Sequence, residues 1–203
     1  MANSIILSAS YLPPVSYFHA ALKNEGPIVL DNAEHFPKQT YRNRVSIATA
    51  NGVLDLTIPI THGRKERIPM KDVKISYDHE WQRLHWLSIQ TAYRSSAYFE
   101  YYEDDFRPFY EQKFDYLFDY NLKQLELVLK VFKSKKEIRF TDSFAKEYPE
   151  DLDFRNLIHP KKESVYKNQK PYYQVFEERT GFLPDVSVLD LIFNQGPQSK
   201  NFL

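Results

Sequence analysis

The pair Asn51-Gly52 and the segments on either side of it constrain the fold of this chain most. Residues 45–48 alternate apolar with small or polar side chains, and residues 54–60 repeat this alternation. A period of two is typical of a strand with one buried face, and Asn-Gly favours the tight turn that joins two antiparallel strands. The sequence therefore predicts a β-hairpin over residues 45–60, so the fold must include a sheet.

The first part of the chain carries further strand signals. Residues 4–10 read as a buried strand, a helix follows Pro14, and residues 28–30 read as a second strand. Such a β-loop-α-β opening favours α/β organisation with at least one parallel pair of strands. Another strand is predicted at residues 73–77.

The hydrophobic period becomes helical in the second part. We predict a helix from Asp78, as its N-cap, to about residue 93, another within residues 98–112, and an amphipathic helix over residues 114–132. A terminal helix is expected near residues 187–194. These segments make the C-terminal half largely helical.

Residues 133–170 interrupt this pattern, because they are charged and lack a stable period. A structureless segment of this length is unusual inside a compact domain, so we expect either a short helix or a mobile lid there. No repeat or linker divides the chain, which predicts one domain over residues 1–203. The predicted class is α/β, with α+β as the alternative: a mixed sheet from the N-terminal 77 residues and a helical C-terminal half packed on it.

Composition excludes several classes of protein. There is no cysteine, which excludes disulfides, thiolate metal sites and a cysteine nucleophile. The 27 basic residues balance 27 acidic ones, so no overall basic field favours nucleic acid as a partner. The apolar run Ile5-Ile6-Leu7 is too short for a secretory signal or a membrane helix. We therefore expect a cytoplasmic protein without membrane insertion.

Familiar cofactor and catalytic motifs are missing as well. The sequence has no Walker A loop, no Gly-x-Gly-x-x-Gly and no Gly-x-Ser-x-Gly. Its six histidines include no pair at i,i+4 and no His-x-His, so no metal-site spacing is present. The sequence identifies neither a cofactor nor an oligomeric state.

Arg42 and Arg44 are the first candidates for binding. If they lie on a strand, its periodicity aims both guanidinium groups to one side and Asn43 to the other. Two guanidinium forks suit a phosphate, a pyrophosphate or a carboxylate. The alternative is a pair of surface arginines that bind Asp or Glu.

The loop after the first strand is a second candidate. A strand, a tight Pro-containing loop and a helix place backbone N–H groups at the helix start, which makes an anion site. Tyr11 and Tyr17 lie where polar groups of such a site would be. Alternatively, both tyrosines pack in the core.

Two histidines could transfer a proton. His85 shares a helical stripe with Trp81 and Tyr93, so its ring is either hydrogen-bonded in the core or lines a pocket. His159 and Lys161 lie in a polar loop that is either a substrate-closing element or solvated.

The last candidate feature is at the start of the terminal helix. Ser187 and Asp190 have the Ser-x-x-Asp spacing of a capping box ahead of an apolar run, which we take as their first role.

Three segments together resemble the WbqC-like family, whose members are found in bacterial gene clusters for surface polysaccharides such as O-antigen. They are residues 7–18, residues 41–44 and residues 189–196. The resemblance implies a cytoplasmic enzyme of surface-polysaccharide biosynthesis that acts on a nucleotide- or phosphate-linked sugar, by group transfer. The alternative is a non-catalytic sugar- or partner-binding protein of the same pathway. The chain departs from the family in residues 133–170, where other members are longer.

The resemblance also implies roles for particular residues. His85 or His159 would serve as general acid or base. Substrate contacts are implied for these residues: Tyr11, Tyr17, Arg42, Asn43, Arg44, Lys161, Gln174, Asp190 and Asn194. For Asp190 and Asn194, and with less support for Gln174, a buried polar network is the alternative. An enzyme should gather its polar residues around one cleft, whereas a binding module should leave them scattered and expose an aromatic patch.

Overall fold

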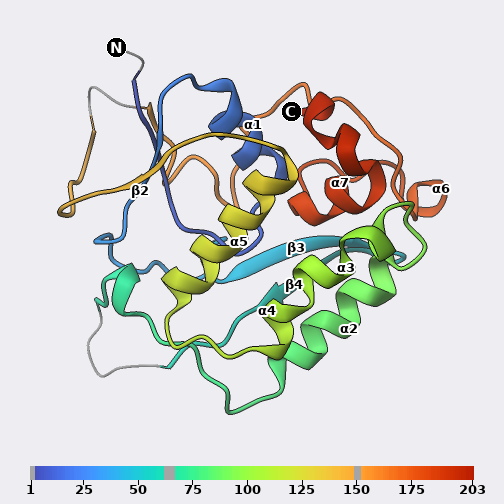
Figure 1. The fold of residues 1–203 in the computed structure, drawn as a ribbon, viewed down its shortest axis with the longest axis horizontal. Helices are drawn as coiled ribbons and strands as arrows, with labels where there is room; N and C mark the ends of the chain where they lie inside the picture. The colour runs from blue at the N-terminus through green and yellow to red at the C-terminus, as the bar shows by residue number, and fades with distance from the viewer. Residues whose placement is uncertain (1–2, 62–66, 149–151) are drawn as a thin grey trace.

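A four-stranded parallel sheet organises the N-terminal part of the fold. The computed structural model describes residues 3–61, 67–148 and 152–203 and has an α/β fold (Figure 1). The strand order is β5-β2-β1-β6, and every pairing is parallel. The strands are β1 (Ile5–Leu7), β2 (Ile28–Leu30), β5 (Ile138–Phe140) and β6 (Leu152–Asp153). The α/β class is therefore confirmed.

The predicted β-loop-α-β opening is confirmed too. Helix α1 (Val15–Lys23) follows Pro14, whose φ of −64° suits the start of a helix, and connects β1 to β2. All three residues of β1 are buried, because a central parallel strand is covered on both faces.

A separate antiparallel hairpin confirms the prediction around Asn51-Gly52. Strands β3 (Arg44–Thr49) and β4 (Gly52–Thr57) pair with Thr49 opposite Gly52. Gly52 has a φ of 96°, which glycine adopts without strain. The predicted strand at 73–77 is wrong, since Lys74 and Ile75 form only isolated bridges.

Most of the helices lie in the second half, as predicted, with changes at their ends. They are α2 (Trp81–Tyr93), α3 (Phe99–Phe106), α4 (Pro108–Glu111), α5 (Leu117–Val131), α6 (Glu177–Thr180) and α7 (Val188–Gln195), with short 3₁₀ helices η1 (Met70–Asp72) and η2 (Gly196–Phe202). Asp78 is not the N-cap of α2, because the helix begins after Glu80 and the Asp78 carboxylate binds the Ser76 hydroxyl. Pro108 starts α4 and thereby divides the helix expected within 98–112.

Residues 133–170 supply β5 and β6, which the sequence did not predict. The mixed sheet expected from the N-terminal 77 residues is thus two sheets, one of which takes both outer strands from this later range. These strands have three and two residues and are partly exposed. Strands so short give no readable period.

Helix α7 is almost completely buried among other elements. It contacts α1, α2, α3 and β3, and Figure 1 shows the hairpin between α7 on one side and α2 on the other. The ring of Phe193 packs against Tyr93, Phe99 and Phe106 at centroid distances of 5.1–5.5 Å. No helix in the described part of the chain is long and apolar enough to cross a membrane.

Candidate functional site

The carboxyl edge of the parallel sheet is the place where this topology favours a site. From β1 the chain adds β2 and β5 on one side and then β6 on the other, so the switch point lies between β1 and β6. Open α/β sheets bind ligands outside the carboxyl ends of the strands at such a point. Here the segments after the two strands meet, because the Ser8 hydroxyl donates to the carbonyl of Arg155 at 3.5 Å.

A buried ion-pair network closes the innermost part of this edge. Arg155 is buried, and its Nη1 lies 2.5 Å from the carboxylate of Asp31, which directly follows β2. The same guanidinium binds Asp153 at 2.5 Å and donates to the carbonyls of Ala145 and Lys146. Every nitrogen of Arg155 is used, so this network holds the strand ends together and leaves no donor for a ligand.

Arg42 and Arg44 do not share an anion site; each binds a carboxylate, which was the alternative for this pair, although Arg42 is buried rather than at the surface. Arg42 lies in a turn before β3, where strand alternation does not apply, and its buried guanidinium binds both oxygens of Glu34 at 2.7 and 2.6 Å. Arg44 opens β3 and pairs with Asp55 across the hairpin at 3.3 Å. Asn43 is buried and donates to the Ile58 carbonyl at 2.9 Å, which closes the end of the hairpin.

A polar cavity of about 470 Å³ lies outside this edge and brings two predicted residues together. Arg44 and Lys161 both line it, although they come from distant parts of the sequence. Its remaining polar lining consists of Lys162, the hydroxyls of Tyr41, Ser46 and Ser164, and the carboxylates of Asp55 and Asp185. Cations and hydroxyls in one cavity suit a ligand that carries both an anionic group and sugar hydroxyls.

The two carboxylates of this cavity are already engaged. Asp55 binds Arg44 and accepts from the Ser46 hydroxyl at 2.6 Å. Asp185 accepts from the backbone N–H of Ser16 at 2.7 Å, at the start of α1. The anion site predicted at that helix start is thus filled by the chain's own carboxylate.

The lysines of the cavity bind only neutral acceptors. Lys161 Nζ lies 3.0 Å from Oε1 of Gln39, and Lys162 Nζ lies 2.8 Å from the carbonyl of Asn156. Within the described residues no carboxylate pairs with either lysine. An anionic ligand would therefore offer each ammonium group a stronger partner than it has now.

His159 borders this cavity through its neighbour Pro160. Its Nδ1 accepts from the backbone N–H of Lys161 at 3.0 Å, which places the proton of the neutral ring on Nε2. Burial, followed by the charges of Lys162 and Arg42, lowers the pKa of His159. This shift favours the neutral form of the ring.

His85 lies in the core, which was one of the two alternatives for it. Its Nδ1 is 3.0 Å from the hydroxyl of Tyr11, which is itself 3.0 Å from the hydroxyl of Tyr110. Burial lowers the pKa of His85 to about 4, although a hydrogen bond to the backbone of Thr57 acts to raise it. Trp81 packs edge-on against the imidazole at 5.1 Å. Neither His85 nor Tyr11 reaches the polar cavity.

Tyr17 is also a core residue. Its side chain is buried, and its hydroxyl donates to the carbonyl of Ser8 at 3.0 Å. This bond joins α1 to the segment after β1, and the hydroxyl has no second hydrogen to donate to a ligand.

Gln174, Asp190 and Asn194 form the buried polar network that was the alternative to substrate contact. Gln174 donates to Asp190 at 2.7 Å, and Asn194 donates to the Asp190 backbone carbonyl at 2.8 Å. Burial raises the pKa of Asp190 to about 6, although hydrogen bonds from Gln174 and two tyrosines act to lower it. Ser187 is the N-cap of α7, as predicted, but the Asp190 carboxylate does not complete a capping box.

The predicted site residues therefore divide among several places. Arg44 and Lys161 share the cavity and His159 borders it, whereas Arg42, His85 and Asp190 each have separate partners. The sequence analysis did not predict that Lys162 lines this cavity or that Arg155 joins a buried ion-pair network. Arg155 follows β6, a strand too short to be predicted from the sequence. Lys162 belongs to the charged residues 133–170, in which no single lysine stands out. Within the described ranges no group of three His, Asp or Glu side chains is placed to hold a metal ion.

Comparisons with known proteins identify a family for this chain. The model of the WbqC-like protein family matches residues 9–156. "Uncharacterized protein Rv1507c" of Mycobacterium tuberculosis is 22% identical over 231 residues, covering 100% of this chain and 98% of the relative. No solved structure matches.

Proposed function

The chain belongs to the WbqC-like protein family, and from this premise we propose that it binds a nucleotide- or phosphate-linked sugar in bacterial surface-polysaccharide biosynthesis. The polar cavity beside Arg44 and Lys161 would hold this ligand. The leading form of the proposal is a cytoplasmic group-transfer enzyme.

One observation carries the proposal: Arg44, Lys161 and Lys162 converge on the cavity together with three hydroxyl groups. Each lysine binds only a neutral acceptor, so a phosphate would gain charge-assisted hydrogen bonds there. The hydroxyls of Ser46 and Ser164 would face the sugar.

His159 would transfer the proton in such a reaction. The lowered pKa favours the neutral ring, which is the form that a general base requires. Its neighbours Pro160 and Lys161 line the cavity, so a ligand bound there would lie close to this segment.

A non-catalytic binding protein is the second candidate. It is favoured by one observation, which is that Arg42, His85 and Asp190 are each bound inside the chain and away from the cavity. In that case the cavity would hold the sugar phosphate without turnover.

A ligand screen tests the proposal. The melting temperature of the purified protein is measured with nucleotide sugars, sugar phosphates, nucleotides and free sugars, since a ligand that binds the native state stabilises it. We expect a saturable increase with a sugar phosphate or nucleotide sugar, and loss of that increase in Lys161→Gln/Lys162→Gln.

Lys71→Gln/Lys130→Gln is the matched control, because both lysines are exposed and lie outside the cavity. It should keep the wild-type response. The proposal fails if no ligand raises the melting temperature, or if the cavity variant responds as the wild type does. Turnover of the bound ligand, and its loss in His159→Gln, would separate the enzyme from the binding protein.

A further inference from the structure

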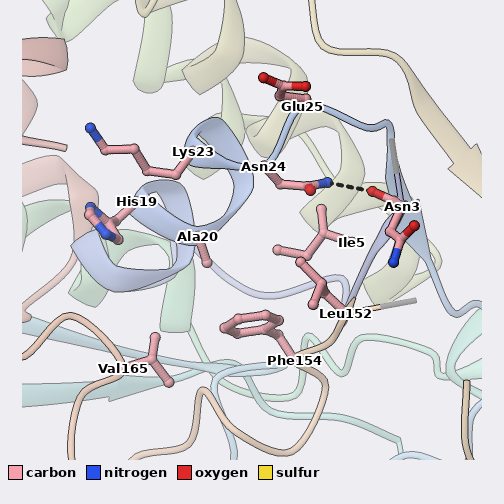
Figure 2. Close-up of a pocket in the computed structure, with 10 residues that line it drawn as sticks. All are labelled: Asn3, Ile5, His19, Ala20, Lys23, Asn24, Glu25, Leu152, Phe154 and Val165. Carbon is pink, nitrogen blue, oxygen red and sulfur yellow. Dashed lines mark hydrogen bonds between the residues drawn. The ribbon is translucent and has the colours of Figure 1, made fainter. Parts of the chain in front are cut away.

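Two hollows adjoin at the amino ends of β1 and β2, at the opposite end of the sheet from the polar cavity. The first has a volume of about 540 Å³ and lies beside α1 (Figure 2). Apolar side chains from β1, α1 and β6, and from the segment that follows β6, line it: Ile5, Ala20, Leu152, Phe154 and Val165. Figure 2 shows these side chains around the hollow, with Lys23 and Glu25 at its periphery.

The second hollow has a volume of about 470 Å³ and is rich in lysine. Its ammonium groups come from the turn after α5 and from η2: Lys133, Lys135, Lys136 and Lys200. Glu25 lines both hollows, so they meet at the loop that joins α1 to β2.

The lysines outnumber the free carboxylates in this second hollow. Glu137 accepts two hydrogen bonds of 2.8 Å from Arg139. Glu25 is therefore the carboxylate in this hollow that is left to oppose the positive charge of the lysines. Lys133 and Lys135 form no ion pair within the described residues. Unpaired ammonium groups gathered in one place attract a multiply charged anion.

The loop between the hollows has a fixed position. Lys136 Nζ donates to the carbonyls of Asn24 and Gly26, the latter at 3.1 Å. Asn24 in turn donates to the carbonyl of Asn3 at 3.1 Å, as Figure 2 shows. Lysines near the end of α5 also complement the helix dipole, but this accounts neither for Lys200 nor for the apolar hollow next to them.

We infer that the two hollows together bind an anionic amphiphile. A phosphate or similar head group lies among Lys133, Lys135 and Lys200, and an apolar chain fills the hollow beside α1. The positive charge of the lysines selects the anionic head group, and the apolar side chains of the first hollow select the hydrocarbon tail of the ligand. This site goes beyond the proposed function, because it shares no residue with the polar cavity.

Titrations with three probes test the contributions of the anionic head group and of the hydrocarbon tail separately. The probes are octyl phosphate, inorganic phosphate and octyl glucoside, with affinities measured by calorimetry. Each methylene that becomes buried should tighten binding roughly fourfold. We expect octyl phosphate to bind at least about tenfold more tightly than either other probe. Equal affinity for octyl phosphate and one of the other two overturns the inference.

Variants assign the binding to these residues. Lys133→Gln/Lys135→Gln should weaken octyl phosphate about tenfold or more, whereas Glu25→Gln should strengthen it by removing the opposing charge. Ala20→Phe should weaken octyl phosphate and leave inorganic phosphate unchanged. If Ala20→Phe lowers the melting temperature, Leu152→Glu is tested in its place. Leu152 is 45% exposed, so the fold should tolerate a substitution there. Unchanged affinity in all of these variants would contradict the site.

The polar-cavity variant Lys161→Gln/Lys162→Gln is the control and should bind octyl phosphate as the wild type does. Failure of the sugar-phosphate proposal would therefore leave this result intact, and the reverse also holds. Vesicles of phosphatidylglycerol or phosphatidylcholine identify the source of the amphiphile. Lysine-dependent sedimentation with phosphatidylglycerol alone supports a lipid head group, and octyl phosphate binding without it supports a free phosphorylated amphiphile.

Discussion

The hydroxyl of Tyr11 lies 3.0 Å from Nδ1 of His85 and joins the loop after β1 to helix α2. Both side chains are buried, and the two rings are nearly parallel at a centroid distance of 5.8 Å. A histidine in this position stabilises the fold, so its effects should be visible in stability rather than in ligand binding.

Substituting His85 should therefore destabilise the protein. We expect His85→Gln to lower the free energy of unfolding by about 2–3 kcal/mol and Tyr11→Phe by about 1–2 kcal/mol, because each leaves a buried polar group without its partner. Urea denaturation at pH 7.5 measures both values. Unchanged stability in His85→Gln would restore the pocket interpretation.

The same histidine should make stability depend on pH. Burial lowers the pKa of His85 to about 4, whereas an unfolded histidine titrates near 6.5. The unfolded chain then binds more protons between these values, so stability is complete above pH 6.5 and is lost as the pH falls toward 4. The difference amounts to up to about 3 kcal/mol. Comparing wild type with His85→Gln at pH 7.5 and pH 4.5 should show a smaller loss in the variant.

Asp190 should make the stability of the protein depend on pH in the opposite direction to His85. Burial raises its pKa to about 6, above an unfolded value near 3.9. The folded chain holds the proton longer, so this contribution is complete at low pH and is lost as the pH rises through 6, by up to about 3 kcal/mol. Between pH 4 and pH 6.5, Asp190→Asn should therefore gain more stability than the wild type, in which the Asp190 contribution offsets that of His85. An identical pH profile in variant and wild type would contradict the raised pKa.

Arg42 and Arg44 should differ strongly in their effect on folding. Arg42→Gln leaves the buried carboxylate of Glu34 without its partner, which costs about 3–5 kcal/mol. Arg44→Gln breaks a partly exposed pair with Asp55 and should cost less than about 1 kcal/mol. Denaturation of the two single variants tests this contrast. Arg42→Gln/Glu34→Gln should recover part of the loss, and equal stabilities of the single variants would refute the assignment.

Gly196 should be less tolerant of substitution than Gly181. Both have a positive φ, of 51° and 68°, with ψ of −126° and 178°, which is a conformation that only glycine adopts readily, so alanine strains the backbone at either position by about 1–3 kcal/mol. A Cβ at Gly196 would also lie 2.5 Å from the ring of Tyr98, whereas nothing lies within 4 Å of one at Gly181. Gly196→Ala should therefore cost about 2–4 kcal/mol in total. Thermal unfolding of the two variants is the measurement, and similar melting temperatures would be inconsistent with the close contact.

Much of the fold could be predicted because its signals are local. The hairpin follows from alternation around Asn51-Gly52, α1 follows from Pro14, and the start of α7 follows from its Ser187 cap. The outer strands β5 and β6 could not be predicted. They are held by pairing with β2 and β1, which lie far from them in the sequence.

The candidate site was predictable only in part, for a related reason. Residue type and spacing pointed to Arg44 and Lys161, which the fold brings to one cavity. Spacing could not show that Arg42 faces Glu34, because the turn before β3 turns its side chain out of the strand pattern. The spacing of residues within one segment does not show which residue of another segment will face them in the fold.

The burial of α7 among elements that precede it has a consequence for synthesis of the protein. A ribosome makes α1, α2, α3 and β3 before it makes α7, yet these elements pack on α7. Until residue 193 has left the exit tunnel, the rings of Phe99 and Phe106 lack the partner that covers them. Nascent chains that stall before residue 188 should therefore be targets for chaperones that bind exposed aromatic segments.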